Sequence, residues 1–199
     1  MPFPRRPRAR FLAAALAAAG LALAVSPILA AEPAPVAVPT TASHDGAHDF
    51  DFNIGVWRTH IRRILNPFAG GDQSMQLNGT VTVRKVWDGR GQIEEIEADG
   101  PNGHWEGLTL FLYNPAAGQW TQTYADASNG VLTTSTVGEF KNGRGELYAT
   151  ETVNGRQVLI RGVWSHIAPD SHTFDEAYST DGGRTWLPVF IAELTRIAK

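Results

Sequence analysis

The chain has 199 residues, with 17 lysines and arginines against 20 acidic residues and a formal net charge of −3. It contains no cysteine. A disulfide framework and a lipid-modified cysteine are therefore both excluded, and the core must hold the fold without covalent cross-links.

Residues 1–31 are typical of a secretory signal. Four arginines lie between positions 5 and 10, an apolar stretch covers 11–25, and Ala30-Ala31 supplies small residues for cleavage. The apolar stretch is shorter than the ~20 residues that a membrane-spanning helix needs. We therefore expect a periplasmic or secreted protein from which the signal has been removed, with no membrane span left.

Removal of that segment also changes the charge and the start of the folded unit. Without its four arginines the chain keeps 13 of its 17 basic residues against 20 acidic ones, which argues against nucleic acid and anionic membrane surfaces as partners. Residues 32–48 are rich in Ala, Pro, Thr and Ser, a composition typical of a flexible linker. One folded domain is expected over 49–199.

The rest of the chain consists of short apolar stretches between turn signals such as Asn154-Gly155, the strongest type of hairpin signal. Helical periodicity is absent from it. The expected strands are 56–65, 75–87, 92–98, 104–113, 119–126, 131–140, 146–153, 157–167, 171–179 and 185–197. Sequential hairpins predict an all-β, antiparallel, up-and-down barrel of about ten strands, with a two-layer β-sandwich as the alternative.

The two ends of this strand series resemble the lipocalin-like (calycin) barrels. Gly55-Val56-Trp57 resembles their G-x-W opening, and Arg196 resembles the arginine that lies across that tryptophan in the superfamily. Such a contact is a favourable cation–π interaction. A wider resemblance, to a bacterial exported lipocalin-like family of uncharacterised function, covers nearly all of 48–196. It rests on residues 48–58, 107–110, 113–115, 179–186 and 195–196. It implies the barrel and the exported setting, and no established reaction.

Residues 179–186 match the pattern S-x-D-x-G-x-x-W of an Asp-box hairpin. In such a turn, Asp181 is expected to accept backbone N–H bonds and Trp186 to pack beneath it. One copy on a chain of this length indicates a structural turn, and not the repeated blades of a propeller.

Alternating side chains predict which residues face the interior. On 56–65, Trp57 and Arg63 share one face, so His60 is exposed if Trp57 points inward. On 171–179 the set is His172, Phe174, Glu176 and Tyr178. On 185–197 it is Trp186, Pro188, Phe190, Ala192 and Leu194.

An interior lined by aromatic residues and a few polar groups is typical of a small-ligand site. The candidate ligand-binding residues are Trp120, Gln122, Tyr124, Phe174, Glu176, Tyr178, Phe190 and Glu95, the last on one face with Ile93. The predicted partner is a small, largely apolar molecule. The alternative is a filled barrel in which these polar groups satisfy one another.

Two other functions stay open: an enzyme acting on a small hydrophobic acid through an interior Glu, Tyr and Arg, and a module that binds another envelope protein. No catalytic residue, cofactor or metal site is assigned. The histidines at 44 and 48 fall in the expected linker, which does not favour an ordered metal site. His166 and His172 flank Asp170-Ser171, which indicates an exposed turn and disfavours haem ligation.

Overall fold

The computed structural model describes residues 45–71 and 73–198, and this part of the chain is almost entirely β-structure. The expected signal segment and residues 32–44 of the expected linker lie outside the described residues. No helix among the described residues is long and apolar enough to cross a membrane.

Eleven strands form one sheet in which every neighbouring pair is antiparallel. They are β1 Gly55–Ile64, β2 Ser74–Val86, β3 Gly91–Gly100, β4 Gly103–Asn114, β5 Gln119–Asp126, β6 Val131–Leu132, β7 Thr136–Lys141, β8 Arg144–Val153, β9 Arg156–Ala168, β10 Ser171–Ser179 and β11 Leu187–Ala198. The described part also holds three short 3₁₀ helices, η1 Gly46–His48, η2 Asp51–Asn53 and η3 Trp87–Gly89.

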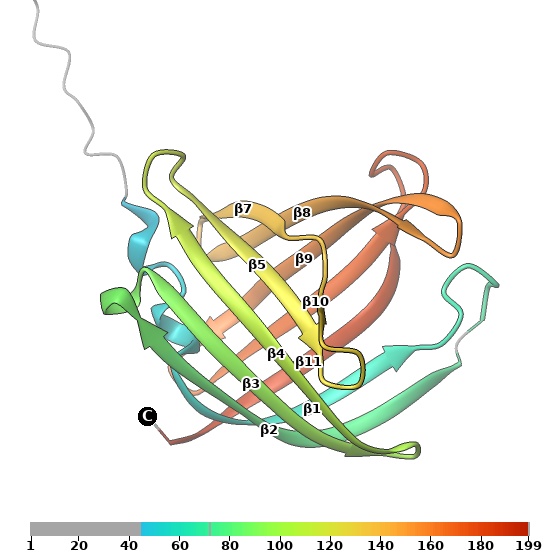
Figure 1. Ribbon diagram of the computed structural model, residues 1–199, viewed down its shortest axis with the longest axis horizontal. Helices are drawn as coiled ribbons and strands as arrows, with labels where there is room; N and C mark the ends of the chain where they lie inside the picture. The colour runs from blue at the N-terminus through green and yellow to red at the C-terminus, as the bar shows by residue number, and fades with distance from the viewer. Residues whose placement is uncertain (1–44, 72, 199) are drawn as a thin grey trace, which may run out of the picture. The chain divides into compact units, whose positions relative to one another are not determined.

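The sheet closes into a barrel because β1 pairs with β11 and β4 pairs with β5 (Figure 1). Ten strands make the ring, and the two-residue β6 pairs only with the end of β5. The predicted up-and-down barrel is confirmed, and the two-layer sandwich is wrong. The expected strand 131–140 is interrupted: the chain leaves the ladder between Leu132 and Thr136.

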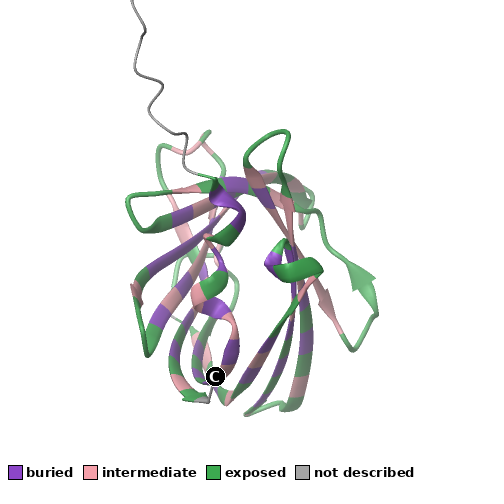
Figure 2. Cartoon of the chain, turned by 90° about the vertical axis from the view of Figure 1, so that its left-hand side faces the viewer, coloured by how far each residue is buried: buried purple, intermediate pink, exposed green. Residues whose placement is uncertain are grey.

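Buried and exposed residues alternate along the strands, as the banding in Figure 2 shows. On β1, Trp57, Thr59 and Ile61 are buried, whereas Arg58 and His60 are exposed. The Trp57 face therefore points inward, and His60 lies outside the barrel.

Two strand glycines permit unusually close contact between neighbouring strands. A Cβ at Gly79 would lie 1.9 Å from the carbonyl oxygen of Glu97, and a Cβ at Gly138 would lie 1.9 Å from that of Glu146. Only glycine fits where one backbone approaches another this closely. These positions let the sheet coil tightly enough to close.

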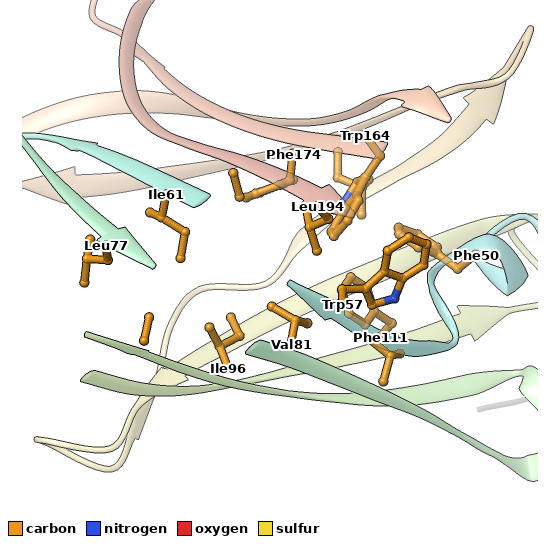
Figure 3. Packing of buried hydrophobic residues seen from close by; sticks show 14 of the residues in the cluster. Phe50, Trp57, Ile61, Leu77, Val81, Ile96, Phe111, Trp164, Phe174 and Leu194 are labelled. Atoms are coloured by element: carbon orange, nitrogen blue, oxygen red, sulfur yellow. The ribbon is translucent and has the colours of Figure 1, made fainter. Parts of the chain in front are cut away.

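One end of the barrel is closed by residues 45–54, which include η1 and η2 (cyan in Figure 1). Phe50 is fully buried there, with its ring centroid 4.8 Å from those of Phe111 and Phe140 and 5.1 Å from that of Trp120. Figure 3 shows Phe50, Trp57 and Phe111 gathered together, with Ile61 and other core residues further along the barrel.

Side chains from three strands hold this segment by donating to its backbone carbonyls. Trp57 Nε1 donates to Asn53 O at 2.7 Å, Gln92 Nε2 to Phe50 O at 3.0 Å and Trp120 Nε1 to Gly46 O at 2.8 Å. Because Gly46 and Ala47 are buried, the expected linker is too long. Its last residues, 45–48, belong to the closed end of the barrel.

Candidate functional site: a cavity inside the barrel

A cavity of about 430 Å³ occupies the barrel interior above this closed end. Its walls come from both halves of the ring, including Ile61 of β1, Ile96 of β3 and Phe174 of β10. Phe68 of the β1–β2 loop and Asn154 of the β8–β9 turn also line it. Since β1 begins at the closed end and runs into the β1–β2 loop, the cavity extends to the opposite end of the barrel.

An aromatic series runs through this cavity. Ring centroids are 6.3 Å apart between Tyr124 and Trp105, 6.4 Å between Trp105 and Phe190, 6.2 Å between Phe190 and Phe174, and 4.7 Å between Phe174 and Trp164. All five residues line the cavity. They form a continuous apolar surface along which a ligand can make contact.

Trp105 and Phe190 meet across the lumen. Trp105 belongs to β4 and Phe190 to β11, and three strands separate β4 from β11 on this side of the ring. Their contact therefore narrows the interior at that level.

Glu176 lies in the cavity wall with Tyr178, Glu151 and Arg63 close enough to influence it. Burial raises the pKa of Glu176 to about 7; the negative charge of Glu151 adds to the rise, while the Tyr178 hydroxyl and Arg63 oppose it. Burial and the neighbouring Glu176 also raise the pKa of Tyr178 well above its usual range. Glu176 therefore changes its charge near neutral pH.

A third carboxyl group, Asp126, lies at the end of β5. Asp126 Oδ2 accepts hydrogen bonds from Trp105 Nε1 at 2.9 Å and from the Tyr124 hydroxyl at 3.3 Å. Hydrogen bonding from Ser128, aided by these donors, lowers the pKa of Asp126. Asp126 thus stays ionised and holds two aromatic side chains in place.

The most buried carboxyl group of the cavity lining is Glu94 of β3, which is only 5% exposed. Its Oε2 accepts a hydrogen bond from Asn53 Nδ2 at 3.2 Å. Burial raises the pKa of Glu94, although Asn53 and Thr109 oppose the shift. On the neighbouring wall, Thr59 is fully buried, lines the cavity, and has no hydrogen-bond partner for its hydroxyl among the described residues.

His172 is buried near the closed end, although Asp170 and Ser171 beside it predict an exposed turn. Its ring centroid is 4.3 Å from that of Trp57 and 5.0 Å from that of Phe52. Neither ring nitrogen has a hydrogen-bond partner in the part of the chain that the structure describes. Burial, with a smaller effect of Arg196, lowers the pKa of His172 to about 3, so the ring is neutral.

Most of the predicted ligand-binding residues line this cavity. They are Gln122, Tyr124, Phe174, Glu176, Tyr178 and Phe190. Gln122 also accepts a hydrogen bond from Trp164 Nε1 at 3.0 Å through its Oε1. The structure therefore brings the two predicted groups, on β5 and on β10–β11, to one site.

Two of the predicted residues lie elsewhere. Glu95 is exposed, and its carboxylate pairs with Arg84 at 2.6 Å on the outside of the barrel; its neighbour Glu94 faces the cavity instead. Trp120 does point inward, but it lies at the closed end below the cavity, with its indole nitrogen bonded to Gly46.

The inward face predicted for residues 185–197 is wrong at its first two members, Trp186 and Pro188. The pairing of β10 with β11 shifts between Glu176 and Ala177, so that Glu176 faces Phe190 and Ala177 faces Pro188. This bulge reverses the alternation. Pro188 is therefore exposed, and Trp186 lies outside the cavity lining with the Arg161 guanidinium over its ring at 4.1 Å.

The Asp-box turn has the expected hydrogen bonds. Asp181 Oδ1 accepts from the backbone N–H groups of Arg184 at 3.0 Å and Thr185 at 2.9 Å. These bonds, together with those from the Thr185 and Ser179 hydroxyls, lower the pKa of Asp181 to about 2. Gly183 lies next to Trp186 in the same turn. The motif shapes a loop and contributes nothing to the cavity lining.

Several cavity residues were not singled out from the sequence. Glu94 shares a strand face with Ile96 and Ala98, but Glu95 shares the other face with Ile93, so alternation alone does not reveal which glutamate faces the cavity. Arg63 follows Trp57, Thr59 and Ile61 on the inward face of β1. Strand alternation is the only sequence signal for the other cavity residues, which are Thr59, Trp105, Glu151 and Trp164.

No family model and no curated protein matches the sequence. Among solved structures, an S-type phycobiliprotein lyase, CPES, from Guillardia theta is similar at a TM-score of 0.53 and 14% identity, over 75% of this chain and 91% of that one. The redesigned β barrel mFAP0, bound to DFHBI, has a TM-score of 0.42 at 9% identity, over 73% and 99% of the two chains. A de novo designed fluorescence-activating β barrel has a TM-score of 0.39 at 12% identity, over 77% and 98%. The likeness to the lyase shows a shared lipocalin-like barrel fold.

Proposed function

We propose that this barrel binds a small, largely apolar molecule in its interior. The observation that supports this most is the cavity of about 430 Å³, which falls within the ~300–1,000 Å³ typical of ligand pockets. Its aromatic series supplies apolar contact area, and Glu176, Gln122 and Thr59 supply a few polar contacts.

A neutral fluorescent probe tests this proposal directly. N-phenyl-1-naphthylamine should brighten on adding the protein, and native mass spectrometry of protein from its host should show a retained small molecule. Ala192→Phe fills the cavity from β11, because Ala192 is buried and lines it. We expect this variant to lose probe binding while it keeps a cooperative melting transition.

The matched control is Thr195→Phe, which adds the same ring at an exposed position of the same strand. It should bind the probe as the wild type does. If both phenylalanine variants bind the probe equally well, the molecule lies outside the barrel and the proposal fails.

A catalytic role for Glu176 is a second candidate. This carboxyl combines a pKa near 7 with a neighbouring tyrosine hydroxyl and a nearby arginine in an accessible cavity. Such a group can act as a general acid or base at neutral pH. Mass spectrometry of the retained molecule, before and after incubation with wild type and with Glu176→Gln, distinguishes binding from catalysis. Conversion by the wild type alone would indicate an enzyme.

We also propose that the protein is exported to the periplasm or secreted. The proposal is supported by the arginine-rich start, the apolar stretch and the small residues of positions 1–31. N-terminal sequencing of the protein recovered from its host, outside the cytoplasm, should begin close to Ala31. A cytoplasmic product that keeps residues 1–31 would contradict it.

A further inference from the structure

Acidic side chains outnumber basic ones in the cavity lining. Four carboxyl groups line it, and Arg63 is the single basic side chain among the described lining residues. Within the described part of the chain, Arg63 forms no ion pair with any of the four. The carboxyl groups are Glu94, Asp126, Glu151 and Glu176.

The protein itself uses three aromatic hydrogen-bond donors of the cavity. Trp105 Nε1 and the Tyr124 hydroxyl donate to Asp126, and Trp164 Nε1 donates to Gln122. By contrast, the Glu151 carboxylate has no hydrogen bond or ion pair with the described residues. Glu151 therefore offers a carboxylate to a ligand without first giving up such a contact within the described part of the protein.

A buried group points to a ligand independently of this charge. The Thr59 hydroxyl is fully buried, lines the cavity, and has no partner in the described residues. A buried polar atom left without a partner costs about 1–3 kcal/mol, and a polar group of a bound molecule would remove that cost.

We propose that the cavity selects a small organic cation: a protonated amine carried on an apolar, preferably aromatic, body. The amine lies between Glu151 and Glu176, and the body lies along the Trp105–Phe190–Phe174 series. This inference rests on the proposed function, since it specifies the chemistry of the molecule that the same cavity holds.

Two forces act in the same direction on such a ligand. The ammonium group is attracted to carboxylates that Arg63 neutralises only in part. It is also attracted to the faces of tryptophan and tyrosine, which favour cations. An anionic ligand of equal size would face repulsion from the same carboxylates, so charge alone separates the two classes.

Binding should depend on pH because Glu176 titrates near neutrality. The charged groups that act on it are Glu151 from β8 and Arg63 from β1, with the Tyr178 hydroxyl on its own strand. The residues opposite it on β9 and β11, Gly162 and Phe190, carry no charge. A bound ammonium stabilises the ionised carboxylate, so amine affinity should rise, with release of a proton, between about pH 6 and about pH 8.

Three naphthalene probes of matched shape test the inference: 1-(aminomethyl)naphthalene as the cation, 1-naphthalenemethanol as the neutral form and 1-naphthaleneacetic acid as the anion. Titration calorimetry should show the amine binding about tenfold more tightly than the alcohol at low salt, with the acid weakest. The advantage of the amine should shrink when salt is raised from about 50 mM to about 500 mM.

The double variant Glu151→Gln with Glu176→Gln should bring the amine and the alcohol to nearly equal affinity while the affinity for the alcohol is kept. Glu95→Gln, on the outer face of the barrel, should change neither affinity. If the alcohol binds as well as the amine, or the acid binds best, the cation inference is overturned and the ligand-binding barrel stands. If none of the three probes binds, the proposed function and this inference both fail.

Discussion

The Arg196 guanidinium lies over the Trp57 ring at 3.8 Å, which joins the first strand of the barrel to the last. The same side chain donates to three backbone carbonyls: Nη1 to Ile54 O, Nη2 to Phe52 O and Nε to Pro169 O, each at 2.8 Å. One arginine thus holds the segment that closes the barrel, the β9–β10 turn and the first strand together.

We expect Arg196→Met to lower the free energy of unfolding by about 2–4 kcal/mol, because it removes charge-assisted hydrogen bonds and a cation–π contact. Arg196→Lys should recover only part of this, since one ammonium cannot donate to three carbonyls in a fixed fork. Urea denaturation measures the effect, with the exposed Arg58→Met as control. Equal stability of the Met and Lys variants would contradict this role.

The strand glycines give a second prediction. Gly79→Ala should cost about 1–3 kcal/mol or more, because the new methyl group would overlap the Glu97 carbonyl and force the strands apart. Gly71→Ala is the matched control. No atom lies within 4 Å of its Cβ position, and its φ lies outside the left-handed region. Thermal melting should separate the two variants; similar melting temperatures would show that β2 and β3 can move apart freely.

Local chemistry explains why most strands could be predicted from the sequence. Asn154-Gly155 and Asn142-Gly143 adopt the left-handed backbone that such turns require, with φ of 50° and 76° in the first pair and 53° and 74° in the second. Turn residues of this kind define strand ends without knowledge of the partner strand. Ring closure depends on distant pairing: the sequential hairpins favour a closed barrel over a sandwich, and the resemblance at Trp57 and Arg196 indicates which strands meet.

The site residues were harder to predict because alternation along a strand shows which face of the sheet a side chain lies on, but not how far along the barrel it lies. Trp120 and Tyr124 share the inward face of β5, yet Trp120 lies at the closed end and Tyr124 in the cavity. On β3 each face carries isoleucine and glutamate, so the pattern alone could not separate Glu94 from Glu95. The bulge in the pairing of β10 with β11 reverses the alternation, so Trp186 is not on the predicted face. No turn residue in the sequence marks this bulge.

The neutral, buried His172 predicts an acid-sensitive barrel. Its pKa is about 3 in the folded protein and about 6.5 when unfolded. The unfolded chain therefore binds a proton that the folded one does not between these values. The contribution of His172 to stability falls by up to ~1.4 kcal/mol per pH unit as pH drops below about 6.5.

His172→Phe keeps an aromatic ring beside Phe52 and Trp57 and removes the titrating group. Comparing urea denaturation at about pH 7 and about pH 5 should show a smaller loss for this variant than for the wild type. The comparison cancels the carboxyl groups, which titrate in both proteins. In NMR spectra the His172 ring should not titrate down to pH 5; a transition near its ordinary pKa would show that water reaches the ring.

Glu94 has the opposite pH dependence. Burial raises its pKa above the ordinary value of 4.5, so the folded protein keeps a proton that the unfolded chain has lost. The stabilising effect is complete below about pH 4.5 and is lost as pH rises through the folded pKa. Glu94→Gln should therefore gain stability relative to wild type as pH rises above about 4.5, because the amide can still accept from Asn53 and carries no charge.

Glu94→Leu separates hydrogen bonding from charge at the same position. It leaves the Asn53 amide without its acceptor inside the barrel, so we expect a loss of about 1–3 kcal/mol at every pH. Glu95→Gln, on the exposed face of the same strand, should stay within about 0.5 kcal/mol of wild type. If Glu94→Gln were as unstable as Glu94→Leu at pH 8, the carboxylate would have to be ionised and paired in the folded barrel. That result would contradict the raised pKa of Glu94 in the folded protein.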